Sequence, residues 1–183
     1  MQKLFQTFTK QTYAYSAFVI LSASFNLQIL NFLNNILGEK NVTKVFYILT
    51  ICFFAYLLIM SLKMKINTIR KVTIVIIVFT VLYLMYKQTI FAEKTHFFMY
   101  GLLGFLAMKD TASKIQNIKM SLLIAVCFCA GVSILDELFQ GLLPYRVYDI
   151  KDIILNLIST IFGIVLQISF CPLCKRIGCG GWI

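Results

Sequence analysis

The sequence is poor in charged residues, and poorest in acids. Charged residues make up 13% of its 183 residues, and Asp and Glu number only 7 against 17 Lys and Arg. So little charge, together with 60% hydrophobic residues gathered in long runs, excludes an ordinary soluble domain and indicates an integral membrane protein. The net charge of +10 does not indicate a nucleic-acid partner, because the lysines stand in short clusters between apolar runs.

Histidine and paired cysteine motifs are also scarce. His96 is the only histidine, and one histidine does not make a usual zinc site, so neither a metal nor a cofactor is predicted. Three cysteines lie in apolar runs, where small buried side chains are expected: Cys52, Cys127 and Cys129. Three more lie in CPLCKRIGC, without a fourth ligand, and predict a solvated or lipid-modified tail: Cys171, Cys174 and Cys179.

Long apolar runs fill most of the chain. They are Tyr13–Leu30, Val45–Leu62, Val72–Tyr86, His96–Met108, Met120–Leu135 and Ile150–Phe170. A spanning helix needs about 20 residues, so the third and fourth runs must borrow flanking residues. An unclosed sheet leaves backbone groups unsatisfied in lipid. The predicted fold is therefore all-α, a polytopic transmembrane helix bundle of about six spans.

The first run has a signal-like beginning and a polar end. Lys3 and Lys10 precede it as in a signal sequence, but further spans follow, so we expect an uncleaved first helix. Its last part, NLQILNFLNNIL, is amphipathic and predicts an interfacial extension of that helix. A polar contribution to a site shared with other helices is the alternative.

The positive charges predict the orientation. With the N-terminus in the cytoplasm, the inner segments hold 11 of the 17 Lys and Arg, which favours an N-in, C-in chain. Residues 1–94 then carry three spans, residues 95–170 carry the other three, and residues 171–183 are a short Cys-rich cytoplasmic tail of what we expect to be one structural domain. The loop between the fifth and sixth spans faces outward.

Polar residues mark the facing ends of these two spans. Cys129, Ser133, Asp136 and Gln140 follow one helical stripe of the fifth, with Glu137 beside it. The sixth has the same spacing in Asp152, Asn156, Ser159 and Gly163, and Pro144 breaks the chain between them. His96 opens the fourth span at the same end, with Tyr100 one turn deeper. Ionisable groups near hydrocarbon are costly, so this cluster is a predicted site.

These residues resemble the signature of the VanZ-like family of bacterial membrane proteins. The matching elements are H-F-x-x-Y (His96, Phe97, Tyr100), D-E-x-x-Q (Asp136, Glu137, Gln140), P-x-R (Pro144, Arg146) and D-x-x-x-N (Asp152, Asn156), within residues 95–170. Two positions depart from it: Glu93 stands where members often carry lysine, with Lys94 beside it, and Ser159 stands where glycine is common. The resemblance implies a multi-pass protein of a bacterial cytoplasmic membrane and a link to resistance against teicoplanin-type lipoglycopeptides; it implies no particular reaction.

Four functions follow from the predicted site. The residues that bind a ligand would be His96, Tyr100, Asp136, Glu137, Gln140, Arg146, Asp152 and Asn156. The ligand would be an amphiphile such as a membrane lipid, an undecaprenyl-linked wall precursor or the lipoglycopeptide itself. His96 with Asp136 or Glu137 would alternatively serve as the acid and base of a hydrolase or transferase that acts on lipid head groups, although no nucleophile is evident. A small transporter is a weaker alternative because no inverted repeat is visible. The fourth interpretation is purely structural: Arg146 would bridge the acids and fix the ends of the helices.

Overall fold

The fold is a helix bundle, seen here in a computed structural model that describes residues 7–88, 91–143 and 149–170. The helices in these ranges are α2 (Lys10–Leu37), α3 (Glu39–Lys63), α4 (Thr68–Lys87), α5 (Phe91–Lys114), α6 (Ile118–Gly141) and α7 (Ile150–Phe170). The described ranges contain no strand. The all-α prediction is confirmed.

Four of these helices are long and apolar enough to cross a membrane: α3, α4, α6 and α7. Large apolar side chains on the outward faces of α3 and α4, such as Leu49, Leu62 and Ile69, are more than half exposed, as expected of helices that contact lipid. The chain is therefore a membrane protein by its helices. The count of six spans and the N-in orientation stay predictions.

The helices extend beyond the apolar runs. α4 begins at Thr68 and α5 at Phe91, so both reach the length that a span needs. The sequence placed His96 at the start of its helix, and this is wrong, because His96 lies in the second turn of α5. The first turn holds Glu93 and Lys94. Hydropathy excludes these charged residues from the apolar run, but an acid in the first turn is favourable because it lies at the positive end of the helix dipole.

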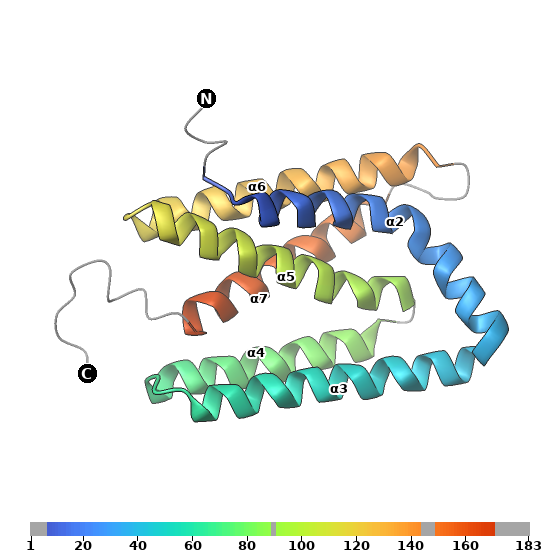
Figure 1. The fold of residues 1–183 in the computed structure, drawn as a ribbon, viewed down its shortest axis with the longest axis horizontal. Helices are drawn as coiled ribbons and strands as arrows, with labels where there is room; N and C mark the ends of the chain where they lie inside the picture. The colour runs from blue at the N-terminus through green and yellow to red at the C-terminus, as the bar shows by residue number, and fades with distance from the viewer. Residues whose placement is uncertain (1–6, 89–90, 144–148, 171–183) are drawn as a thin grey trace.

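Two apolar cores share α5 and α7. One gathers residues of α2, α5, α6 and α7, including Val19, Leu103, Cys129 and Ile164. The other gathers residues of α3, α4, α5 and α7, including Phe54, Ile74 and Val81. Figure 1 shows α7 crossing the bundle obliquely behind α5, with the α3–α4 hairpin on one side and α6 on the other. The two shared helices therefore fix the relative position of everything else.

Glycines allow α5 and α7 to touch backbone to backbone. A Cβ on Gly163 would collide with the carbonyl of Gly101, and one on Gly104 would collide with the carbonyl of Thr160. Small residues at a helix crossing let two backbones approach closely in a membrane protein. This crossing sets how near the side chains of α5 and α7 come to each other one to two turns away.

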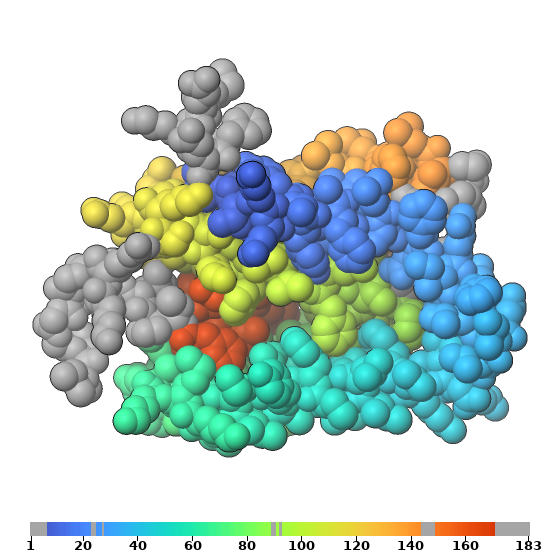
Figure 2. Space-filling view, viewed as in Figure 1, coloured from blue at the N-terminus to red at the C-terminus, as the bar shows by residue number. Residues whose placement is uncertain are grey.

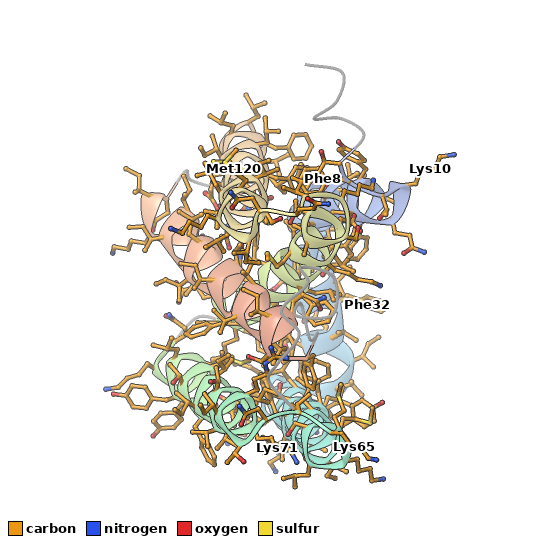
Figure 3. All side chains as sticks on the ribbon, turned by 90° about the vertical axis from the view of Figure 1, so that its left-hand side faces the viewer. Phe8, Lys10, Phe32, Lys65, Lys71 and Met120 are labelled. Atoms are coloured by element: carbon orange, nitrogen blue, oxygen red, sulfur yellow. The ribbon has the colours of Figure 1, made fainter. Side chains whose placement is uncertain are left out.

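Asp110 ties the beginning of α2 to the far end of α5. Its Oδ2 atom accepts hydrogen bonds from the Thr9 backbone N–H and the Thr12 hydroxyl, both at 2.7 Å. Thr9 is also the N-cap of α2, so the carboxylate accepts from a backbone N–H that the helix leaves unsatisfied at its start. Its negative charge also lies at the positive end of the helix dipole. Figure 3 views the bundle from this end, with Lys10 on one side and Lys65 and Lys71 on another.

The second half of α2 continues as the predicted helical extension and turns across the end of the bundle (Figure 1). Asn26 reaches inward from it, donating to the Thr95 hydroxyl at 3.0 Å, whereas Phe32 is 64% exposed. Gly38 then joins α2 to α3 with φ 80°, a conformation that favours glycine.

The predicted burial of cysteines is right for one of the three that the structure describes. Cys129 is buried, whereas Cys52 and Cys127 are exposed. An apolar run buries only the helix face that meets a neighbour, so hydropathy alone does not distinguish the two faces. Cys171, Cys174 and Cys179 lie outside the described residues.

Candidate functional site

Three helix ends bring most of the predicted polar residues together. α5 supplies His96 and Tyr100, α6 supplies Asp136, Glu137 and Gln140, and α7 supplies Asn156. None of these six side chains is more than 6% exposed. In Figure 1 the first turns of α5 and the last turns of α6 both lie toward the right-hand end of the bundle. The helical spacing in the sequence predicted that these side chains share one face of each helix, and that face is buried in the structure.

A chain of hydrogen bonds joins His96 to Ser133 through Asn156. His96 Nδ1 lies 2.7 Å from Asn156 Oδ1, and Asn156 Nδ2 donates to Ser133 Oγ at 3.0 Å. Because the amide nitrogen of Asn156 faces Ser133, its oxygen is the acceptor and His96 Nδ1 carries the proton. In a neutral imidazole the lone pair is then on Nε2, which makes Nε2 the basic atom.

Tyr100 and Asp136 form a second buried contact beside this chain. The Tyr100 hydroxyl donates to Asp136 Oδ2 at 2.8 Å, and both side chains are at most 1% exposed. The Tyr100 ring stacks on the imidazole of His96 with a centroid distance of 6.0 Å and an interplanar angle of 5°. The two polar contacts therefore share one face of α5.

Glu137 connects the end of α6 to the beginning of α7. Its Oε2 atom accepts from the Asp149 backbone N–H at 3.3 Å, and Gln140 Nε2 lies 3.5 Å from Oε1. Asp149 in turn accepts from the Lys151 N–H at 2.8 Å, at the start of α7. A structural role is thus visible for part of the acidic cluster.

Two more acids lie at the edge of the buried group. Asp152 is half-buried in the first turn of α7. Glu93 on α5 lies within electrostatic range of Asp152, Asp149 and His96. These two acids therefore place negative charge next to the buried network. Arg146 and Pro144, the remaining predicted elements, lie outside the described residues.

Ser133 lies on the predicted stripe but was not among the residues expected to bind a ligand, and the structure adds it to the network. It is fully buried and accepts the hydrogen bond that orients Asn156. The signal was present, because Ser133 lies on the stripe that carries Asp136 and Gln140. A serine in an apolar helix is so often bonded to its own backbone that spacing alone does not single it out.

The arrangement is suited to holding polar groups of a ligand and to moving a proton at His96. Ser133 is bonded to Asn156, and in the described residues no hydrogen bond links its hydroxyl to the imidazole, as an activated nucleophile would require. The described residues contain no cluster of three or more His, Cys, Asp or Glu that would hold a metal ion.

Comparison with known proteins finds a family but no individual relative. The model of a family described as VanZ/LLP1 matches residues 3–171. The match extends well beyond the signature between His96 and Gly163 and includes α2, α3 and α4. No curated protein and no solved structure matches the chain.

Proposed function

Because this chain belongs to the VanZ/LLP1 family, we propose that its buried polar network is an outward-facing binding site in a bacterial cytoplasmic membrane. The ligand is an amphiphile with a polar head, either an undecaprenyl-linked wall precursor or a lipoglycopeptide, and binding contributes to teicoplanin-type resistance. The observation that carries the proposal is the burial of His96, Tyr100, Asp136 and Asn156 in one connected group.

Energetics favour a functional origin of this group. Each buried polar side chain costs free energy unless it is fully bonded, and well-packed apolar residues often stabilise a core as much or more. The two apolar cores consist of side chains outside this group, Tyr100 excepted, so apolar packing does not account for most of the group. In a membrane protein, buried ionisable residues characteristically mark a ligand or ion site.

Charge distribution supports the outward face. Lys65 and Lys71 flank the α3–α4 turn, which lies at the left-hand end in Figure 1, and Figure 3 shows both from that end. The polar network lies toward the other end. The positive-inside rule favours a cytoplasmic location for the lysine-rich end, which supports a network on the side where wall precursors and antibiotics are met.

Each residue has a distinct role in the proposed site. Tyr100, Gln140 and Asn156 exchange their internal hydrogen bonds for bonds to the head group. Asp136, Glu137 and Asp152 favour a cationic or hydroxyl-rich head, and Arg146 binds a phosphate where the head has one. The exposed apolar helix faces accommodate the tail.

Antibiotic sensitivity tests the physiological part. Cells that express the wild type should tolerate more teicoplanin and dalbavancin than empty-vector cells, and His96→Ala, Glu137→Gln and Arg146→Ala should remove the difference at equal protein levels. Equal sensitivity of wild-type and empty-vector cells would contradict the resistance role. The binding site is then tested by the binding experiment alone.

Binding to purified protein tests the site itself. We expect saturable binding of an undecaprenyl-linked wall precursor or of teicoplanin, lost in Asn156→Ala. Asn31→Ala is the matched control, because Asn31 is exposed on α2 and should leave binding unchanged. Unaltered binding in a folded Asn156→Ala protein would rule out this site.

The fixed tautomer of His96 favours one second candidate, a membrane enzyme that hydrolyses or transfers lipid head groups. Asn156 holds Nδ1 and leaves Nε2 as a base, which is the arrangement that general base catalysis uses. Head-group release from the bound precursor, abolished in His96→Gln, would establish this candidate. Binding without any release would favour the binder.

A further inference from the structure

Lys94 is a buried cation on a different face of α5 from the polar network. It is 8% exposed, and its Nζ atom donates to the Tyr47 hydroxyl of α3 at 2.8 Å and lies 5.0 Å from the centroid of that ring. Figure 2 shows α3 and α5 on the same face of the molecule. Lys94 is thus directed between two helices rather than into solvent.

No carboxylate of the described residues pairs with this ammonium. The neighbouring Glu93 interacts instead with Asp152, Asp149 and Lys151 on the α7 side. An ammonium has three donors, and the Tyr47 hydroxyl accepts one of them. A charge buried in a membrane protein is costly unless an opposite charge or further acceptors meet it.

The surroundings of Lys94 suit an anion that is attached to an apolar chain. Tyr47, whose hydroxyl accepts from Lys94, is only half-buried, so one member of the pair is partly exposed at the surface of the bundle. Phe98, one turn deeper on α5, packs against Phe53 and Phe54 of α3 with ring centroids 5.6 and 5.9 Å apart. Phe53 is 46% exposed, so this aromatic strip runs from the cation to the lipid-facing surface.

We propose that Lys94 and Tyr47 bind the phosphate of a lipid whose head group is net anionic, with no cation of its own to compensate the phosphate, and that the lipid chain lies along the Phe53–Phe98 strip. The ammonium and the phenol donate hydrogen bonds to phosphate oxygens, and the charge-assisted bond from the ammonium is the stronger of the two. The site is separate from the α5–α6–α7 network, since neither residue takes part in that network's hydrogen bonds. It therefore stands or falls independently of the proposed function.

Lipid binding to the full chain in detergent tests the proposal. Native mass spectrometry would measure the dissociation constants of dioleoylphosphatidylglycerol, which is anionic, and dioleoylphosphatidylcholine, which is zwitterionic. We expect a preference for the anionic lipid that falls about tenfold in Lys94→Gln, as the loss of one charge-assisted hydrogen bond implies. Lys94→Arg should retain it.

Lys87 provides a matched control. Its Nζ atom lies 5.7 Å from the centroid of the Tyr83 ring, a similar pair at the same end, but the lysine is exposed. Lys87→Gln should leave the preference unchanged. An equal effect of Lys87→Gln and Lys94→Gln would overturn the site, because it would show a general surface charge effect.

Two further arms complete the test. The first is competition with inorganic phosphate. Displacement of the anionic lipid would show that the phosphate group alone is sufficient for binding, and a lack of displacement would show that the site also needs the attached lipid chain. Equal affinity of the wild type for both lipids overturns the proposal even if Lys94→Gln fails to fold. A folded Lys94→Gln protein with wild-type preference overturns it as well.

Discussion

Gly163→Ala should push α5 and α7 apart and weaken the site at a distance. The added Cβ would lie 2.7 Å from the Gly101 carbonyl carbon, whereas ordinary contact begins at 3.4 Å, so the backbones must separate by at least 0.7 Å. The same separation lengthens the contact between His96 and Asn156 from 2.7 to about 3.4 Å, beyond the usual limit of about 3.2 Å.

The cost has two parts. Overpacking against backbone costs about 1–3 kcal/mol, and weakening one buried hydrogen bond costs about 1 kcal/mol. Gly131→Ala is the matched control, because nothing lies within 4 Å of its new Cβ. It should stabilise α6 by about 0.5–1 kcal/mol through helix propensity alone.

Reversible unfolding of both variants in mixed micelles, followed by circular dichroism, measures these free energies. The single histidine adds a local probe, since the imidazole nitrogen resonances of His96 report its Nδ1 hydrogen bond without overlap. If Gly163→Ala proves as stable as Gly131→Ala and the imidazole spectrum is unchanged, the backbone crossing does not set the site geometry and the reasoning fails.

Three other predictions concern separate parts of the molecule. Tyr100→Phe removes the donor to Asp136 and should lower the free energy of unfolding by about 1–3 kcal/mol; no loss in the same unfolding assay would show that water replaces the hydroxyl. Asp110→Asn removes the charge at the start of α2 and should cost about 1–2 kcal/mol, measured likewise, with an unchanged stability contradicting the capping role. In a background without native cysteines, Lys151→Cys should react with an impermeant maleimide in intact cells, whereas Lys65→Cys should react only after permeabilisation. The reverse pattern would invert the topology and place the polar network in the cytoplasm.

Periodicity predicted which side chains of each helix turn inward, but not how they pair. The stripe of Asp136 and Gln140 and the spacing of His96 and Tyr100 needed only the helical repeat. The bond between His96 and Asn156 depends on the crossing of α5 and α7, and that crossing follows from glycine contacts between backbones. Such contacts join residues about 60 positions apart, which no local pattern encodes.

Charged residues show the same limit. The count of positive charges treats Lys94 only as one cation on the outer side, and hydropathy leaves it outside the span. The structure places it against Tyr47, where long side chains of α3 and α5 meet. No local pattern predicts the partners of Asp110 either, because Thr9 and Thr12 lie about 100 positions earlier in the chain.

α5 contributes residues to both apolar cores and also carries two separate polar clusters on different faces. One face holds His96 and Tyr100 against α6 and α7, and the other holds Lys94 against α3. Because the two clusters lie on one helix, a ligand at one face that displaces α5 would also change the free energy of binding at the other. If both proposed sites bind their ligands, thermodynamic linkage requires any such influence to be reciprocal: the anionic lipid would alter the affinity of the head-group site by the same factor by which a head-group ligand alters lipid affinity, and the composition of the surrounding membrane would then tune the protein.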